Sequence, residues 1–192
     1  MSQPASQDPQ DAVDLILADH RLVDHLFDRY EAMDGSEPPE VKRELVREFT
    51  RELSIHAAIE EQLFYPMVRD ELPQGDDLVE ESLDEHQGVK ELLAAIEDTD
   101  PAEPKFDERV TMLIREVRHH VQEEETEILP GLRAWLSTDV LQDLGRRLAD
   151  AKATAPTHPH PNAPNEGGVV KTMGDRAMGM VDRVRDDMNQ EG

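Results

Sequence analysis

Two histidine–glutamate pairs occur in the sequence with identical spacing. Glu60 follows His56, and Glu124 follows His120, in each case by four residues. In a helix, residues four apart lie on one face and about 6 Å apart along the axis, so each pair can address a single site. Imidazole nitrogens and carboxylate oxygens are strong ligands for divalent transition metals. The chemistry that this spacing indicates is therefore metal binding.

The two pairs belong to an internal repeat. Pro66 and Pro130 stand at the same distance after the histidine of their pair, so the second copy repeats the spacing of the first. Upstream, the segments that begin at His20 and His86 align with each other and share His, Val and Leu at the same relative places. The chain is thus predicted to consist of two related helical hairpins, each with a single histidine and then a His–Glu pair. Packed face to face, they bring four imidazoles and two carboxylates together.

Burial of these groups favours a metal over a purely structural network. A single histidine on an apolar face is more often a hydrogen-bonded core residue, so a structural bundle without metal is one alternative. An unpaired carboxylate in a bundle interior, however, costs several kcal/mol, and of the cationic residues only Lys90 is a candidate for the core stripe. Two divalent cations would compensate both glutamates. The predicted ligands are His20, His56, Glu60, His86, His120 and Glu124.

Helices must position these ligands, because apolar residues recur at steps of three and four and no alternating strand pattern competes. The expected fold class is all-α, an antiparallel up-down-up-down four-helix bundle with a short capping helix and a C-terminal extension. The first helix is expected to begin with Asp8 as N-cap and Pro9 as first residue. The inward stripes are predicted to be Val13, Ile16, His20, Val23, Phe27, Tyr30; Leu45, Phe49, Leu53, His56, Glu60, Leu63, Met67; Val79, Leu83, His86, Val89, Leu93, Ile96; and Phe106, Val110, Leu113, Val117, His120, Glu124, Ile128.

The chain divides into three predicted parts. Residues 1–152 form the bundle and include a capping helix over 138–152, with Ser137 as its N-cap. Residues 153–168 contain four prolines and two glycines and are expected to be an extended linker. Residues 169–192 are predicted to form a short amphipathic helix that packs on the bundle or on a protein partner.

Composition excludes several classes of function. The 192 residues include 20 basic and 44 acidic side chains, a net charge of −24, which argues against nucleic acid and anionic membranes as partners. Cysteine is absent, so disulfides, iron–sulfur clusters and thiolate zinc sites are excluded. The N-terminal residues lack a signal-peptide pattern, and no apolar run approaches the roughly 20 residues of a membrane span. The expected location is cytoplasmic.

The motifs HAAIEEQLFYP and HHVQEEETEILP, with the isolated His20 and His86 in the right order, resemble the hemerythrin-like proteins, the HHE cation-binding domain family. The resemblance covers about residues 11 to 135. It implies a bundle around two non-haem iron ions, bridged by an oxo or hydroxo group and by two carboxylates.

One departure from the family pattern bears on function. Oxygen-carrying hemerythrins place a second histidine four residues after the one on the third helix, where this chain has Lys90, and an aspartate after a wider gap where this chain has Glu124. The resemblance then implies an extra open coordination position, which favours turnover of peroxide over reversible oxygen binding alone. Other occupants of that position are a water, Lys90, Glu61, Glu125, Tyr30 or Tyr65.

Three functions follow as hypotheses. The leading one is a di-iron protein that binds and decomposes hydrogen peroxide in a catalase-like reaction and also binds O2 or nitric oxide, with the iron pair cycling between ferrous and ferric states. The alternative is a non-enzymatic oxygen-sensing or iron-binding module read by a partner. The third is the metal-free bundle, so whether the chain is an enzyme stays open.

The remaining histidines are assigned structural or surface roles. His119 precedes a ligand directly and points about 100° away from it, toward the surface. His25 lies off the metal-facing stripe. His158 and His160 stand between linker prolines, where an auxiliary metal contact is the minor alternative.

Overall fold

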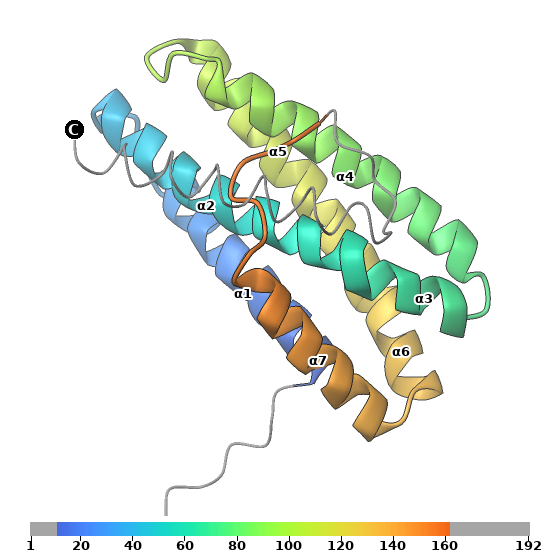
Figure 1. Cartoon of the computed structure of the whole chain (residues 1–192). Helices are drawn as coiled ribbons and strands as arrows, with labels where there is room; N and C mark the ends of the chain where they lie inside the picture. The colour runs from blue at the N-terminus through green and yellow to red at the C-terminus, as the bar shows by residue number, and fades with distance from the viewer. Residues whose placement is uncertain (1–10, 162–192) are drawn as a thin grey trace, which may run out of the picture.

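The computed structural model describes residues 11–161, and all regular elements within that range are helical (Figure 1). Four rods run alternately up and down, which confirms the predicted all-α bundle. The first rod is α1 and the third is α4, while the second (α2, η1, α3) and fourth (α5, η2, α6) are composite. The bounds are α1 Ala12–Glu31, α2 Pro39–Ile59, η1 Glu60–Phe64, α3 Tyr65–Glu71, α4 Gly75–Glu97, α5 Pro104–Glu123, η2 Glu124–Ile128, α6 Leu129–Trp135 and α7 Thr138–Lys152.

The caps at two helix starts are set by side-chain oxygens. Helix α1 begins at Ala12 because the carboxylate of Asp11 accepts a hydrogen bond from the backbone N–H of Asp14 at 2.9 Å. The cap predicted at Asp8 and Pro9 lies outside the described residues, within which the N-cap of α1 is Asp11. For α7, Ser137 accepts from the backbone N–H of Val140, which confirms the predicted cap.

Both composite rods contain one turn of π-helix at the repeated motif. The turn η1 begins at Glu60 and η2 at Glu124, the two predicted carboxylate ligands. The backbone N–H of the residue after each turn donates to the carbonyl of that glutamate, five residues back. Proline follows next in both rods, and because it has no N–H, the ordinary i to i−4 ladder is interrupted there.

The extra residue in η1 rotates the rest of the second rod. Leu63 and Met67, predicted to face the core, are only partly buried. Phe64 and Val68 are instead fully buried. The prediction assumed an unbroken period of 3.6 residues, whereas a π turn adds one residue and shifts the apolar stripe by one position.

Two hydrophobic clusters fill the bundle on either side of its polar middle. One includes Phe27, Phe49, Leu93 and Phe106, toward the loop that joins α1 to α2. The other involves α7, which packs along α1 and against α2. Its members come from every rod, among them Ile16, Ile59, Phe64, Tyr65, Val68, Val79, Ile128, Leu132 and Leu148. The polar site is thus enclosed by apolar packing at both ends.

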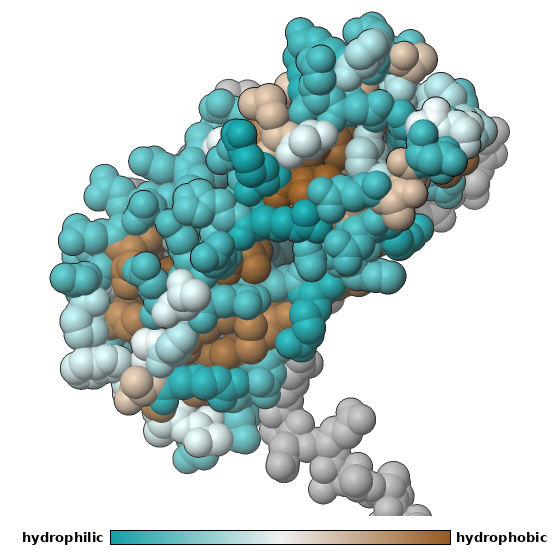
Figure 2. All heavy atoms as spheres, turned by 180° about the vertical axis from the view of Figure 1, so that it is seen from behind, coloured by the Kyte–Doolittle hydropathy of each residue, from teal (hydrophilic) through white to brown (hydrophobic). Residues whose placement is uncertain are grey.

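After α7 the chain crosses over the bundle toward α4 (Figure 1). Ala155 and Thr157 are buried in this crossing, and the side-chain amide of Gln87 donates to the carbonyl of Pro161 at 3.0 Å. The rest of the predicted linker and the predicted C-terminal helix lie outside the described residues. The opposite side of the molecule has a mostly polar surface with hydrophobic side chains visible in its hollows (Figure 2). None of the described helices combines the length and apolar character needed to cross a bilayer.

Candidate metal centre

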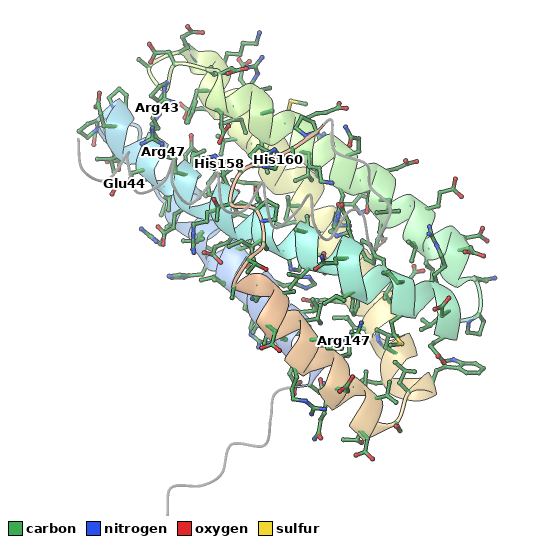
Figure 3. The ribbon with its side chains drawn as sticks, viewed as in Figure 1. Arg43, Glu44, Arg47, Arg147, His158 and His160 are labelled. Carbon is green, nitrogen blue, oxygen red and sulfur yellow. The ribbon has the colours of Figure 1, made fainter. Side chains whose placement is uncertain are left out.

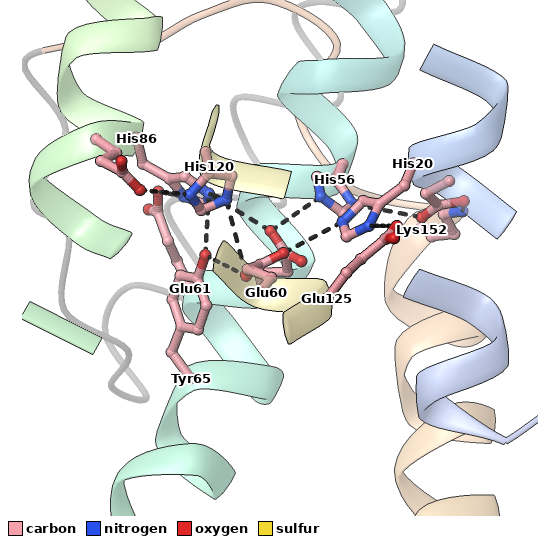
Figure 4. Close-up of polar contacts among 12 residues, drawn as sticks. His20, His56, Glu60, Glu61, Tyr65, His86, His120, Glu125 and Lys152 are labelled. Atoms are coloured by element: carbon pink, nitrogen blue, oxygen red, sulfur yellow. Dashed lines mark hydrogen bonds and ion pairs between the residues drawn. The ribbon is translucent and has the colours of Figure 1, made fainter. Parts of the chain in front are cut away.

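All six predicted ligands meet in the middle of the bundle (Figure 4). Each rod supplies at least one of them, and none is more than 6% exposed. The single histidines come from α1 and α4, and the His–Glu pairs come from the two composite rods at the junction with each π turn. The structure therefore brings together every side chain that the spacing selected.

The two glutamates occupy equivalent positions between the imidazoles. A carboxylate oxygen of Glu60 lies 3.2 Å from Nε2 of His56 and 3.5 Å from Nε2 of His86. An oxygen of Glu124 lies 3.2 Å from Nε2 of His20, and its other oxygen lies 3.7 Å from Nε2 of His120. Each carboxylate thus spans from its own rod to a single histidine of the other hairpin, as a bridging ligand would.

Two overlapping sets of donors emerge from this arrangement. In each set the donor atoms lie within 4.8 Å of one another. One set is His20, His56, Glu60 and Glu124, and the other is Glu60, His86 and His120. The Nε2 atoms of the last two histidines are 3.1 Å apart. Two nitrogens bound at right angles to one ion at about 2.1 Å would be about 3 Å apart, so the spacing suits adjacent ligands of an octahedral metal.

Several of these buried atoms have no hydrogen-bond partner among the described residues. They include Nε2 of His20 and His56, both carboxylate oxygens of Glu60, and Oε2 of Glu124. Leaving such atoms unpaired in an apolar interior costs free energy, whereas a cation would satisfy all of them. The residues present therefore fit a pair of cations.

The opposite ring nitrogens face an outer set of carboxylates. Nδ1 lies 2.9 Å from Glu125 for His20, 3.0 Å from Glu61 for His86 and 2.8 Å from Glu85 for His120. His56 has a longer contact, 3.6 Å, to Asp19. A carboxylate at Nδ1 holds the proton on that nitrogen and leaves Nε2 free to bind a metal. Hydrogen bonds orient His20, His86 and His120 in this way, and Asp19 faces His56 at the longer distance.

Two lysines neutralise part of this outer set. Lys90 lies 2.7 Å from Glu61, and Lys152 of α7 pairs with Asp19. Sequence analysis considered Lys90 and Glu61 but missed Asp19 and Lys152. The repeat offered a signal for one of them, because Asp19 and Glu85 each directly precede the single histidine of their copy. No periodic pattern pointed to Lys152, which reaches the site from the capping helix.

Tyr65 adds a hydroxyl group on one side of the site only. It donates to a carboxylate oxygen of Glu124 at 2.9 Å and lies 3.0 Å from Nε2 of His86. The residue at the equivalent place in the second copy is Leu129. Tyr30, the other tyrosine, is far along the bundle and bonds to Asp107 at 2.5 Å. Tyr65 therefore makes the two halves of the site chemically different.

The electrostatics of the site favour a cation between the glutamates. Burial and the neighbouring Glu124 raise the pKa of Glu60 well above its usual range. Burial acts in the same direction on Glu124, but His120 and His20 outweigh it and lower the pKa of that carboxyl. Burial lowers the pKa of His56 to about 4, so its imidazole is neutral, as a metal ligand must be. A cation between the two carboxyls would offset the repulsion from Glu124 that raises the pKa of Glu60.

The other histidines lie outside this cluster. His25 is exposed, and His119 points to the surface, 3.6 Å from Glu123. His158 pairs with Glu97 at 2.8 Å, and Figure 3 shows it with His160 on the segment that crosses the bundle. Among the described residues, neither of these two joins a group of three or more candidate ligands.

The sequence of this chain is similar to a known protein family and to known proteins. The sequence model of the hemerythrin HHE cation-binding domain matches residues 11–132. A DNA nickase from Nostoc sp. is 29% identical over 153 residues, which cover 80% of this chain but only 42% of the nickase. A hemerythrin-like protein from Schizosaccharomyces pombe is 28% identical over 178 residues, or 92% of this chain and 86% of that protein.

A solved structure has the same fold. It is the crystal structure of a hemerythrin HHE cation-binding domain-containing protein from Mycobacterium kansasii, with a TM-score of 0.64 and 22% sequence identity. The match covers 74% of this chain and 85% of the other.

Proposed function

This chain belongs to the hemerythrin HHE cation-binding domain family, and from that premise we propose that it holds two non-haem iron ions and decomposes hydrogen peroxide. The observation that carries the proposal is the convergence of donor atoms from six buried side chains. Four of these side chains, His20, His56, Glu60 and Glu124, have donor atoms without a hydrogen-bond partner among the described residues. The first ion would be held by His20 and His56, the second by His86 and His120, and both glutamates would bridge them. An oxo or hydroxo group would complete the bridge.

The place of Lys90 supports peroxide turnover over simple oxygen carriage. Its ammonium group is 2.7 Å from one oxygen of Glu61 and 2.9 Å from the other. A lysine whose amine is held between two carboxylate oxygens in this way would not serve as a metal ligand. The coordination position that a histidine fills in oxygen-carrying relatives is thereby left for a substrate molecule.

The reaction is a disproportionation. One peroxide accepts two electrons and two protons and becomes two waters, and a second peroxide returns two electrons and two protons and becomes O2. Two iron ions, when bound, supply and recover the two electrons. The protons need donors and acceptors within hydrogen-bond reach, and the Tyr65 hydroxyl is next to both His86 and Glu124. The outer carboxylates keep each imidazole in the orientation that binding needs.

A second candidate function has one observation in its favour. Lys152 pairs with Asp19, which lies 3.6 Å from His56, so helix α7 is linked to the site through this outer carboxylate. A change of metal state that moves this imidazole would alter how α7 is held. A non-enzymatic sensor of iron, O2 or nitric oxide would signal by that route to a partner of the C-terminal region.

Small molecules are the proposed partners, and nucleic acid is not. The printed name of the Nostoc relative refers to DNA, but this chain spans only 42% of that protein. A net charge of −24 disfavours approach to a phosphate backbone.

The test is iron loading followed by addition of peroxide. The full chain, loaded anaerobically, should hold two iron ions and evolve one O2 for every two peroxides consumed. Peroxide loss no faster than that with the same amount of free iron would contradict the enzymatic proposal. The sensor function would then be the remaining candidate.

A further inference from the structure

A surface hollow leads toward the metal centre between α1 and α5. Its volume is about 350 Å³. The rim is polar and is formed by Arg21, Asp24, Arg118, Gln122 and Thr126. Its lining also includes the buried imidazole of His20 and the exposed carboxylate of Glu125 that faces it. We call this hollow the vestibule.

The rim of the vestibule is held in place by ion pairs. Arg118 contacts three carboxylates of α1, at 2.8 Å for Asp24, 3.1 Å for Asp28 and 2.9 Å for Glu31. Its guanidinium carbon also lies 6.0 Å from the centre of the Phe27 ring. These contacts link α5 to α1 across the opening. The width of the opening is therefore fixed by ion pairs.

A smaller cavity lies directly against the four imidazoles. Its volume is about 20 Å³, room for about one small molecule of the size of water. Apart from the imidazoles, its lining is apolar and consists of Val23, Leu53, Ala57, Val89, Val117 and Val121. Neither bridging glutamate nor Tyr65 is part of this lining. The cavity, which we call the chamber, therefore approaches the site from the imidazole side.

Three valines separate the chamber from the vestibule. Val23, Val117 and Val121 line both spaces, together with His20. The first two are each 4% exposed, and Val121 is partly buried. Valine is branched at Cβ and has few χ1 rotamers, so these side chains form a narrow and stiff constriction.

We propose that the vestibule is the access route to the metal centre and that Val23, Val117 and Val121 are its selective gate. The gate admits uncharged molecules of one or two non-hydrogen atoms, such as hydrogen peroxide, O2 and nitric oxide. An anion would have to leave water to pass the valines, and a branched organic hydroperoxide is larger than the chamber. This inference rests on the proposed di-iron function and names the residues that decide its substrate class.

The direct test follows nitric oxide binding to the iron-loaded ferrous protein. In Val121→Phe, the larger side chain should slow both binding and release of nitric oxide about tenfold and leave the dissociation constant unchanged, because a gate alters the rate of passage and not the bound state. Stopped-flow spectra measure both rates. Val140→Phe is the matched control, since Val140 lies on α7, is 38% exposed and lines neither space.

The opposite variant tests size selection. Val121→Ala should raise the rate with tert-butyl hydroperoxide about tenfold and change the rate with hydrogen peroxide by less than about twofold. Equal nitric oxide rates in wild type and Val121→Phe, or a changed dissociation constant with unchanged release, would overturn the gate. If the wild type decomposes peroxide, those results leave the di-iron function standing. If the wild type neither holds iron nor binds nitric oxide, both proposals fail together.

Discussion

The two halves of the candidate metal centre are alike in the donor atoms that they present and unlike in the residues around those donors. His20 and His56 form the first half, and His86 and His120 form the second, with one glutamate from each composite rod between them. Every imidazole in both halves faces an outer carboxylate through Nδ1. Only the second half has a tyrosine hydroxyl, and only the first half borders the vestibule.

The likeness follows from the repeat, and the differences come from single residues. A duplicated hairpin places matching donors at matching depths in the bundle, which suits two similar ions. Tyr65 stands where the second copy has Leu129, and Lys152 comes from a helix outside the repeat. In the proposed function, the residues that the two copies share would bind the metal ions, and Tyr65 would supply protons.

Loss of either bridging glutamate should have the largest effect on iron content and peroxide loss. The effect should be the same for Glu60 and Glu124. Glu60→Ala and Glu124→Ala would each remove two donor atoms, one from each proposed ion, so iron should fall below one per chain and peroxide loss should drop to the rate of free iron. Elemental analysis and oxygen evolution measure these. Glu127→Ala, an exposed change in the same π turn, is the control. Two irons per chain in either bridge variant would contradict the assignment.

Tyr65→Phe removes the hydroxyl that distinguishes the two halves of the site. Its effect should be smaller than that of losing a bridging glutamate. The variant loses a hydroxyl that contacts Glu124 and His86 but no predicted ligand, so iron content should stay at two per chain. Peroxide turnover should fall about 100-fold if the hydroxyl donates a proton. Tyr30→Phe makes the same chemical change at the distant Asp107 contact. An unchanged rate of peroxide turnover in Tyr65→Phe would show that the tyrosine hydroxyl is not a proton donor in the reaction.

The outer carboxylates allow a matched comparison between the halves. Glu61 and Glu125 occupy equivalent places in the repeat, and each faces a single histidine, but their side chains are 4% and 39% exposed. Glu61→Gln should weaken iron binding about 10- to 100-fold, and Glu125→Gln should weaken it less, because water can replace an exposed partner. Competition with a chelator gives both affinities. A larger loss of iron affinity in Glu125→Gln than in Glu61→Gln would contradict this prediction.

The last prediction concerns the pH dependence of stability in the metal-free protein. Burial opposes ionisation of Glu61, but hydrogen bonds and charge from His86 and Lys90 lower its pKa to about 2 from 4.5. The folded state therefore binds this proton less readily than the unfolded chain, and the stabilisation, on the order of 3 kcal/mol, is present above pH 4.5 and lost as the pH falls toward 2. Urea unfolding at several pH values should show this loss in wild type and a flatter profile in Glu61→Gln. Parallel profiles would contradict it.

Sequence alone predicted the bundle and the convergence of the six side chains. Both depend on periodicity, and a stripe that runs through His20 or His86 must face the same core as its apolar neighbours. The resemblance to the family was confirmed by the match over residues 11–132. Ligation by the six residues stays a prediction that their burial and spacing support.

Other features depend on tertiary structure and had weaker signals. The π turns replaced a regular helix because Pro66 and Pro130 interrupt the hydrogen-bond ladder, and the register of Leu63 and Met67 changed with them. Lys152 reaches Asp19 only because α7 folds back along α1. No local pattern encodes such a contact.

Anomalous diffraction at the iron edge from crystals of the iron-loaded full chain tests the central claim most directly. The account predicts two peaks, one beside His20 and His56 and one beside His86 and His120, with Glu60 and Glu124 between them. A single peak, or peaks at the partly exposed group of Glu85, His119 and Glu123 with none beside the two histidine pairs, would contradict it.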